Sequence, residues 1–138
     1  MARPKQVLED LGLAFEVAVA EAHARSHPDD VEALRGLAYA YTAAGRHEDA
    51  LAADLRLVAR DPERADFRYD LACSYALLGR RDEAFDELTR AVDLGFDDGE
   101  HLDEDPDLDG LRKDPRWAPL RARLPATTAD DDETDDEG

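Results

Sequence analysis

Two stretches of the chain, 34 residues apart, have nearly the same sequence. Residues 36–51 read GLAYAYTAAGRHEDAL, and residues 70–85 read DLACSYALLGRRDEAF. A fixed period of this length is the signature of a protein built from stacked repeats. In each copy the apolar and small residues fall at helical spacing, stop at a glycine and then resume, as in two antiparallel helices joined by a tight turn. The sequence therefore predicts an all-α chain that contains two helical hairpins.

The residues shared by the two copies fall into two size classes. Alanine lies at 38 and 72 on the first helix of each hairpin, and at 50 and 84 on the second helix. Small side chains at these positions let the two helix backbones approach closely, and larger side chains fill the surrounding space. The larger residues are Leu37, Tyr41, Leu71 and Tyr75.

This pattern resembles the tetratricopeptide repeat (TPR) family, and in particular small bacterial TPR proteins that end in a capping segment. The family's 34-residue frame makes 31–64 the first repeat and 65–98 the second. The residues on the signature positions are Leu37, Ala38, Tyr41, Gly45, Ala50 and Pro62 in the first, and Leu71, Ala72, Tyr75, Gly79, Ala84 and Ala91 in the second. The sequence departs from the pattern at Leu34, Asp54, Leu57 and Phe96. The resemblance implies a superhelical stack of hairpins.

The segment before the repeats, residues 1–30, is predicted to be a degenerate half-repeat with one helix over 5–26. Apolar residues three or four apart define one amphipathic helix, and this helix is expected to cover the first repeat. They are Leu8, Leu11, Phe15, Val19 and Ala22. His27-Pro28-Asp29 lies 34 residues before Asp61-Pro62-Glu63, so the repeat frame extends into this helix.

After the repeats, two Asp-Pro pairs mark helix starts at Asp105-Pro106 and Asp114-Pro115. Aspartate accepts hydrogen bonds from the free N–H groups of the first turn, and proline suits the first helical position. Residues 99–124 are therefore predicted to form short helices that cap the stack. Residues 125–138 are predicted to be a disordered acidic tail, since 130–137 holds seven acids in eight positions.

The chain carries 35 acidic and 17 basic residues, a formal net charge of −18. Such a field repels phosphate backbones and anionic lipid, so we expect neither nucleic acid nor a membrane as a partner, and a neutral or basic protein segment instead. Only two lysines accompany 15 arginines, and one hypothesis is adaptation to a salt-rich, halophilic cytoplasm. The first residues lack the apolar core of a signal peptide, and Cys73 is the single cysteine; both favour a cytoplasmic location.

Candidate chemical motifs are weak. Asp105, Asp107 and Asp109 match the opening of a calcium loop, but Arg116 stands where a bidentate glutamate is needed. His23 and His27 are spaced to share a metal ion, with no third ligand fixed beside them. No nucleophile motif or phosphate-binding loop is present in the sequence. We therefore expect no enzyme, no metal and no cofactor.

Binding remains as the predicted activity. In TPR proteins the first helices of successive hairpins line a concave groove, and the resemblance implies eight groove residues here: Glu32, Arg35, Tyr39, Thr42, Asp66, Tyr69, Asp70 and Cys73. Two tyrosines beside an arginine offer a large contact area at low entropic cost. The alternative is that Tyr39 and Tyr69 only pack against neighbouring helices.

The predicted function is non-catalytic protein–protein interaction, with a peptide or partner helix in the groove. A second interpretation is a self-assembling scaffold that forms a homodimer through repeat edges, because two repeats are fewer than the three or so that stability usually requires. An exposed apolar edge on the leading helix, such as Leu8 and Leu11, would favour the dimer. A metal-dependent small hydrolase is a remote third interpretation.

Overall fold

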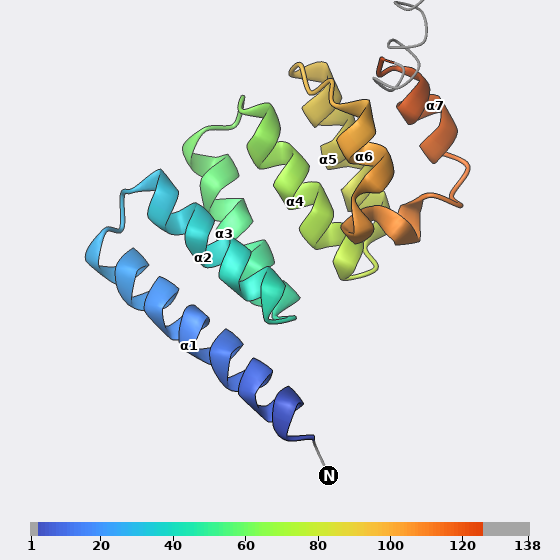
Figure 1. Cartoon of the computed structure of the whole chain (residues 1–138). Helices are drawn as coiled ribbons and strands as arrows, with labels where there is room; N and C mark the ends of the chain where they lie inside the picture. Colours follow the sequence, from blue (N-terminus) through green and yellow to red (C-terminus); the bar gives the residue numbers. More distant parts are fainter. Residues whose placement is uncertain (1–2, 126–138) are drawn as a thin grey trace, which may run out of the picture. The chain divides into compact units, whose positions relative to one another are not determined.

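The computed structural model describes residues 3–125 and is all-helical over that range, as predicted (Figure 1). It contains seven α-helices and one 3-10 helix among the described residues. The chain divides between Pro62 and Glu63 into two compact units, and each is described by itself. The predicted acidic tail, apart from Pro125, lies outside the described residues.

Unit 1 holds α1 (Pro4–Ser26), α2 (Val31–Ala43) and α3 (His47–Arg60). The Asp30 carboxylate caps α2 by accepting a hydrogen bond from the Glu32 N–H at 2.9 Å. The turn between α2 and α3 requires a residue with the left-handed backbone conformation, and Gly45 adopts it with φ 75°. The next N–H, of Arg46, then donates to the Tyr41 carbonyl at 2.8 Å. This hydrogen bond closes α2, and the two helices form the predicted hairpin.

Close packing of α2 on α3 uses the small residues that the sequence singled out. Ala38 on α2 and Ala50 on α3 are buried, and Leu37, Leu51 and Leu57 are buried with them. Because alanine adds little bulk between the backbones, α2 and α3 can lie close together.

The leading helix α1 packs against α2 through the face that carries Val17. Val17 is 3% exposed, whereas Leu8, Leu11 and Phe15 are 70%, 61% and 70% exposed. The apolar residues from which this helix was predicted, such as Leu8, Leu11 and Phe15, therefore lie on its exposed face. The repeat frame explains the difference, because Val17, Leu51 and Phe85 are spaced by 34 and all three are buried.

Unit 2 holds α4 (Ala65–Leu77), α5 (Arg81–Asp93), α6 (Gly99–Glu104), the 3-10 helix η1 (Pro106–Leu111) and α7 (Trp117–Ala122). The α4–α5 turn repeats that of unit 1, with Gly79 at φ 75° and the Arg80 N–H donating to the Tyr75 carbonyl at 2.9 Å. Two sequences that differ at many positions thus use the same turn chemistry.

The C-terminal segment supplies much of the unit 2 core. Its buried leucines join buried side chains of α4 and α5 in one cluster: Leu102, Leu108, Leu111, Leu120 and Leu124. The first Asp-Pro pair starts η1, and Asp105 Oδ1 accepts from the Asp107 N–H at 3.0 Å. After the second pair, Asp114 Oδ1 accepts from the Arg116 N–H at 2.9 Å in a turn, and α7 begins at Trp117 without a side-chain cap. The start of α6 was not predicted. Its N-cap residue, Asp98, accepts a hydrogen bond from the His101 N–H, and an aspartate at this position is a sequence signal for the start of a helix.

Candidate functional site

The first helix of hairpin 1, α2, carries four of the eight predicted groove residues. Glu32 is exposed and Arg35 is half-buried. Thr42 turns its hydroxyl back onto its own helix and donates to the Ala38 carbonyl at 3.1 Å. Tyr39 is 80% exposed, the most exposed large hydrophobic residue among the described residues. This face of unit 1 therefore presents one large aromatic ring to solvent.

The first helix of hairpin 2, α4, carries the other four residues in a different environment. Asp66 accepts two hydrogen bonds from Arg64, at 2.7 and 3.1 Å, and Asp70 is half-buried. Tyr69 and Cys73 are 5% and 7% exposed. They lie beneath the segment that contains α6 and η1.

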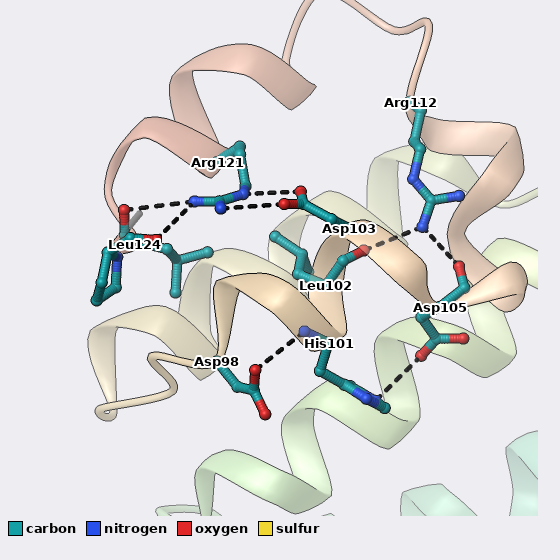
Figure 2. Close-up of polar contacts among 9 residues, drawn as sticks. Asp98, His101, Leu102, Asp103, Asp105, Arg112, Arg121 and Leu124 are labelled. Atoms are coloured by element: carbon teal, nitrogen blue, oxygen red, sulfur yellow. Dashed lines mark hydrogen bonds and ion pairs between the residues drawn. The ribbon is translucent and has the colours of Figure 1, made fainter. Parts of the chain in front are cut away.

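The covering of Tyr69 is specific. Its ring stacks on Phe96 with centroids 4.6 Å apart, and its hydroxyl donates to Asp105 Oδ2 at 2.6 Å. The same carboxylate oxygen lies 3.7 Å from the Cys73 thiol and 3.5 Å from His101 Nε2. Figure 2 shows the His101 side chain directed at Asp105. Asp105 therefore joins three side chains while its other oxygen caps η1.

Burial controls the protonation of this network. Removal from water raises the pKa of the Cys73 thiol well above its ordinary value, and the negative charges of Asp105 and Asp107 raise it further. Burial also raises the pKa of Tyr69, assisted by its interactions with Cys73 and Asp105. Both groups are therefore protonated at neutral pH, and both act as hydrogen-bond donors to the carboxylate.

Two arginines hold the C-terminal segment in place (Figure 2). Arg112 Nη2 donates to the carbonyls of Leu102 and Asp105, at 3.0 and 2.7 Å. Arg121 makes a bidentate pair with Asp103, at 2.7 and 3.0 Å, and also reaches the last described carbonyl, that of Pro125, at 3.1 Å. Sequence reasoning missed these contacts, since the pairs lie up to 18 residues apart and no spacing rule links them.

The candidate metal ligands are occupied by structural roles. Ligand atoms of Cys73, Asp105 and Asp107 lie within 4.8 Å of one another. A metal-binding thiol must lose its proton, whereas the pKa of Cys73 is raised. On α1 the His23 and His27 rings lie 4.6 Å apart, and His27 Nδ1 is 3.1 Å from the His23 carbonyl. At both places the side chains make hydrogen bonds within the chain.

A shallow polar pocket of about 400 Å³ lies at the α4–α5 turn. Its central cation, Arg116, lies 2.8 Å from Asp82 and 2.9 Å from Asp114, and its guanidinium stacks on the Phe85 ring. The hydrogen bonds from Arg116 lower the pKa of Asp114 to about 2. The ion pair between Arg116 and Asp82 therefore links the residue before α7 to α5.

No helix among residues 3–125 combines the length and the apolar character needed to cross a bilayer.

A comparison with protein families decides the affiliation. The model of the bacterial transcriptional activator domain matches residues 6–109, which is most of the chain. The chain belongs to the bacterial transcriptional activator domain family. Members of this family have a helical, TPR-like fold, in agreement with the stacked hairpins. No match was found among the curated proteins.

The family overturns one prediction. Its domains belong to transcriptional activators that bind DNA, so the exclusion of nucleic acid as a partner is wrong. The exclusion rested on a net charge of −18, which is a sum over the whole chain. DNA binding depends on local clusters of Lys and Arg and on the assembly in which a domain works, and a chain-wide sum reports neither.

The family also bears on catalysis. It is a family of regulatory domains rather than of enzymes, which agrees with the expectation of a non-catalytic role.

Proposed function

We propose that this chain is a protein-interaction domain of a bacterial transcriptional activator, and that it binds a peptide or a helix of a partner on α2, the first helix of its first hairpin. The family match supports regulation of transcription as the setting. On this proposal the domain recruits a protein into a DNA-bound complex in the cytoplasm, where bacterial transcription takes place.

One observation carries the binding assignment. Residues 35 and 39 on α2 correspond, one repeat later, to Tyr69 and Cys73 on α4. In unit 2 these two positions are covered by a short segment of the same chain, which supplies an aromatic ring and a carboxylate. In unit 1 Tyr39 occupies the equivalent position and is 80% exposed. The chain's own packing thus supports the use of this helix face for holding a short segment.

The chemistry of the partner follows from the surface around Tyr39. An aromatic ring with one polar end is a frequent anchor at protein interfaces, and Arg35 lies one turn away. The strongly acidic chain favours a neutral or basic partner segment, because like charges slow encounter and weaken binding. The four groove residues on α2, with Tyr39 as the anchor, are the proposed contact set: Glu32, Arg35, Tyr39 and Thr42. Tyr69 and Cys73 on α4 are already covered by the chain itself.

The repeat assignment is also proposed. We take 31–64 and 65–98 as two TPR repeats, residues 1–30 as a half-repeat and 99–124 as the cap. Support comes from α2, α4 and α6, which begin at Val31, Ala65 and Gly99, and from the two glycine turns with equal φ.

The test compares Tyr39→Ala with the wild-type chain. Proteins retained by the tagged wild type from a lysate of the source cell are identified, and the affinity of the strongest candidate is then measured with purified components. Loss of an anchor costs about 2 kcal/mol or more, equivalent to roughly 30-fold in Kd. Leu55→Ala, which truncates an exposed apolar residue on α3, is the matched control and should bind normally. Equal affinities for wild type and Tyr39→Ala would show that this face is not the binding site.

Self-assembly is a second candidate function, favoured by the exposed apolar side chains of α1. The third interpretation, a metal-dependent hydrolase, disagrees with the regulatory role of the family. A stoichiometric metal ion in the purified protein would support it.

A further inference from the structure

One group of side chains in unit 2 combines the ligand types that transition metals prefer. Ligand atoms of Cys73 on α4, Asp105 at the start of η1 and Asp107 within η1 lie within 4.8 Å of one another. Cys73 is 7% exposed, and the side chain of Asp105 is 11% exposed. The group therefore differs from an exposed acidic patch, because two of its members are buried and one of them supplies a sulfur atom.

The spacing of these atoms fits a tetrahedral ion. A Zn–S bond of about 2.3 Å and a Zn–O bond of about 2.1 Å place the two ligand atoms about 3.6 Å apart. Cys73 Sγ lies 3.7 Å from Asp105 Oδ2. An imidazole nitrogen and a carboxylate oxygen on the same ion would be about 3.4 Å apart, and His101 Nε2 lies 3.5 Å from the same Oδ2. Asp105 Oδ2 thus has a sulfur and a nitrogen atom at the distances that separate the ligands of one ion.

His101 is placed to supply a ligand from the solvent side. Its Nε2 atom is farther from Asp105 Oδ2 than the about 2.7–3.2 Å of an ordinary N–H···O hydrogen bond. Figure 2 shows the side chain directed at Asp105 from α6. His101 is outside the group that lies within 4.8 Å, so its ring must turn to reach an ion there. Because the side chain is 56% exposed, it can turn without repacking the core.

The carboxylate of Asp105 is already held in one orientation. The Tyr69 hydroxyl donates to Oδ2 at 2.6 Å, and Oδ1 accepts from the Asp107 N–H at 3.0 Å. Carboxylates that bind metals are usually oriented by hydrogen bonds of this kind. The negative charges of Asp105, Asp107 and Asp70 all act on Cys73, so the local field favours a cation.

We propose that this cluster binds one Zn²⁺ ion, which fastens the C-terminal segment to α4. The four ligands are Cys73, His101, Asp105 and Asp107. Sulfur and imidazole ligands select Zn²⁺ over Mg²⁺ and Ca²⁺, which prefer oxygen ligands. The proposal concerns unit 2 and does not rest on the partner site at Tyr39.

Binding exchanges the thiol proton for the ion. The S–H bond of Cys73 breaks, a Zn–S bond forms and the proton passes to the solvent, while the two carboxylates bind ionised and the imidazole binds neutral. Four protein ligands leave no open coordination position, so the ion would be structural. Zinc at this cluster would therefore not support the hydrolase interpretation, because catalytic zinc keeps a position for water.

The experiment titrates the full chain, freed of metal with a chelator, first with Co²⁺ and then with Zn²⁺. Cobalt bound to a thiolate has a charge-transfer absorption in the near ultraviolet, which should appear at one Co²⁺ per chain. Zn²⁺ should abolish the band, since it binds such sites more tightly than Co²⁺. The melting temperature should rise with Zn²⁺, because the ion binds the folded chain.

Variants identify the ligands. Loss of a group that only orients a ligand typically costs about 10–100-fold in metal affinity, so Cys73→Ser and Asp107→Asn should each weaken Zn²⁺ binding at least about 100-fold. Asp97→Asn removes an exposed carboxylate just before α6 and is the matched control, which should bind Zn²⁺ like the wild type. Circular dichroism checks that each variant keeps its helices.

The outcomes separate the possible errors. A wild type without the cobalt–thiolate band overturns the site, and this result needs no variant. Equal Zn²⁺ affinities for wild type and Cys73→Ser would show adventitious binding to surface carboxylates, which also overturns it. Unchanged affinity in His101→Ala would overturn the assignment of the fourth ligand. The proposed function is judged separately, because Cys73→Ser should leave binding at Tyr39 unchanged.

Discussion

The hydrogen bond between Tyr69 and Asp105 provides the most direct test of how the C-terminal segment is held. Tyr69 is 5% exposed, and the side chain of Asp105 is 11% exposed. The hydroxyl donates at 2.6 Å to a carboxylate oxygen that two other side chains also approach. The change Tyr69→Phe removes only the hydroxyl and keeps the ring that stacks on Phe96.

Tyr69→Phe is expected to lower the free energy of unfolding by about 1.5–2 kcal/mol. Hydrogen bonds to charged groups contribute about 1.5–3 kcal/mol to stability. We expect a value in the lower half of this range, because Asp105 keeps its other hydrogen bonds in the variant. Urea unfolding followed by circular dichroism measures this loss as a shift of the midpoint on the order of 1 M. Tyr39→Phe, at an exposed tyrosine, is the control and should change stability by less than about 0.5 kcal/mol.

A double-mutant cycle identifies the partner. Asp105→Asn keeps a side chain that caps a helix well but removes the charge. If Tyr69 acts through Asp105, the double variant should lose about 1 kcal/mol less than the sum of the two single losses. Strict additivity, or a Tyr69→Phe variant as stable as Tyr39→Phe, would refute the reasoning.

Further predictions concern protonation and salt. Cys73 should react with a thiol reagent at pH 8 more than about tenfold more slowly in the folded chain than in urea, because its raised pKa leaves little thiolate; equal rates would contradict its burial. Because Tyr69 and Cys73 have pKa values above their ordinary 10.0 and 9.0 when folded, their contributions to stability are complete below those values and decline at higher pH. Alkaline unfolding should therefore move to higher pH in Cys73→Ala, measured against the stability of each protein at pH 7. The lowered pKa of Asp114, about 2, contributes stability above its ordinary 3.8 that is lost as the pH falls toward 2. Asp114→Asn should flatten this acid limb of the stability curve. The melting temperature of the wild type should rise with KCl if the acidic surface is a salt adaptation, and a flat response would remove that hypothesis.

Local signals predicted the helices well. Gly45 and Gly79 mark turns because glycine adopts the left-handed conformation that these turns need, and both have φ 75°. Asp105 marks the start of η1 because its carboxylate bonds a free N–H group two residues later, whereas Asp114 forms the same kind of bond in the turn before α7. Each signal involves residues a few positions apart, so it can be read along the chain.

Burial was predicted less well, since it depends on which surfaces meet. The periodicity of α1 indicated an apolar face, but the helix has two, and only packing against α2 shows that Val17 is covered and Phe15 is not. Tyr69 and Cys73 were predicted to line a groove, and the return of the C-terminal segment determines their surroundings. That return depends on contacts such as Arg121 with Asp103, between residues too far apart in sequence for any spacing rule.

The sequence by itself determined the all-α class, the 34-residue period and the glycine turns, because these depend on backbone preferences and on interactions within one or two helical turns. The tertiary structure alone decided which face of α1 is buried and which side chains reach Asp105. The physical reason is that the free energy of burying a side chain comes from the surface that covers it, and that surface belongs to residues distant in the sequence.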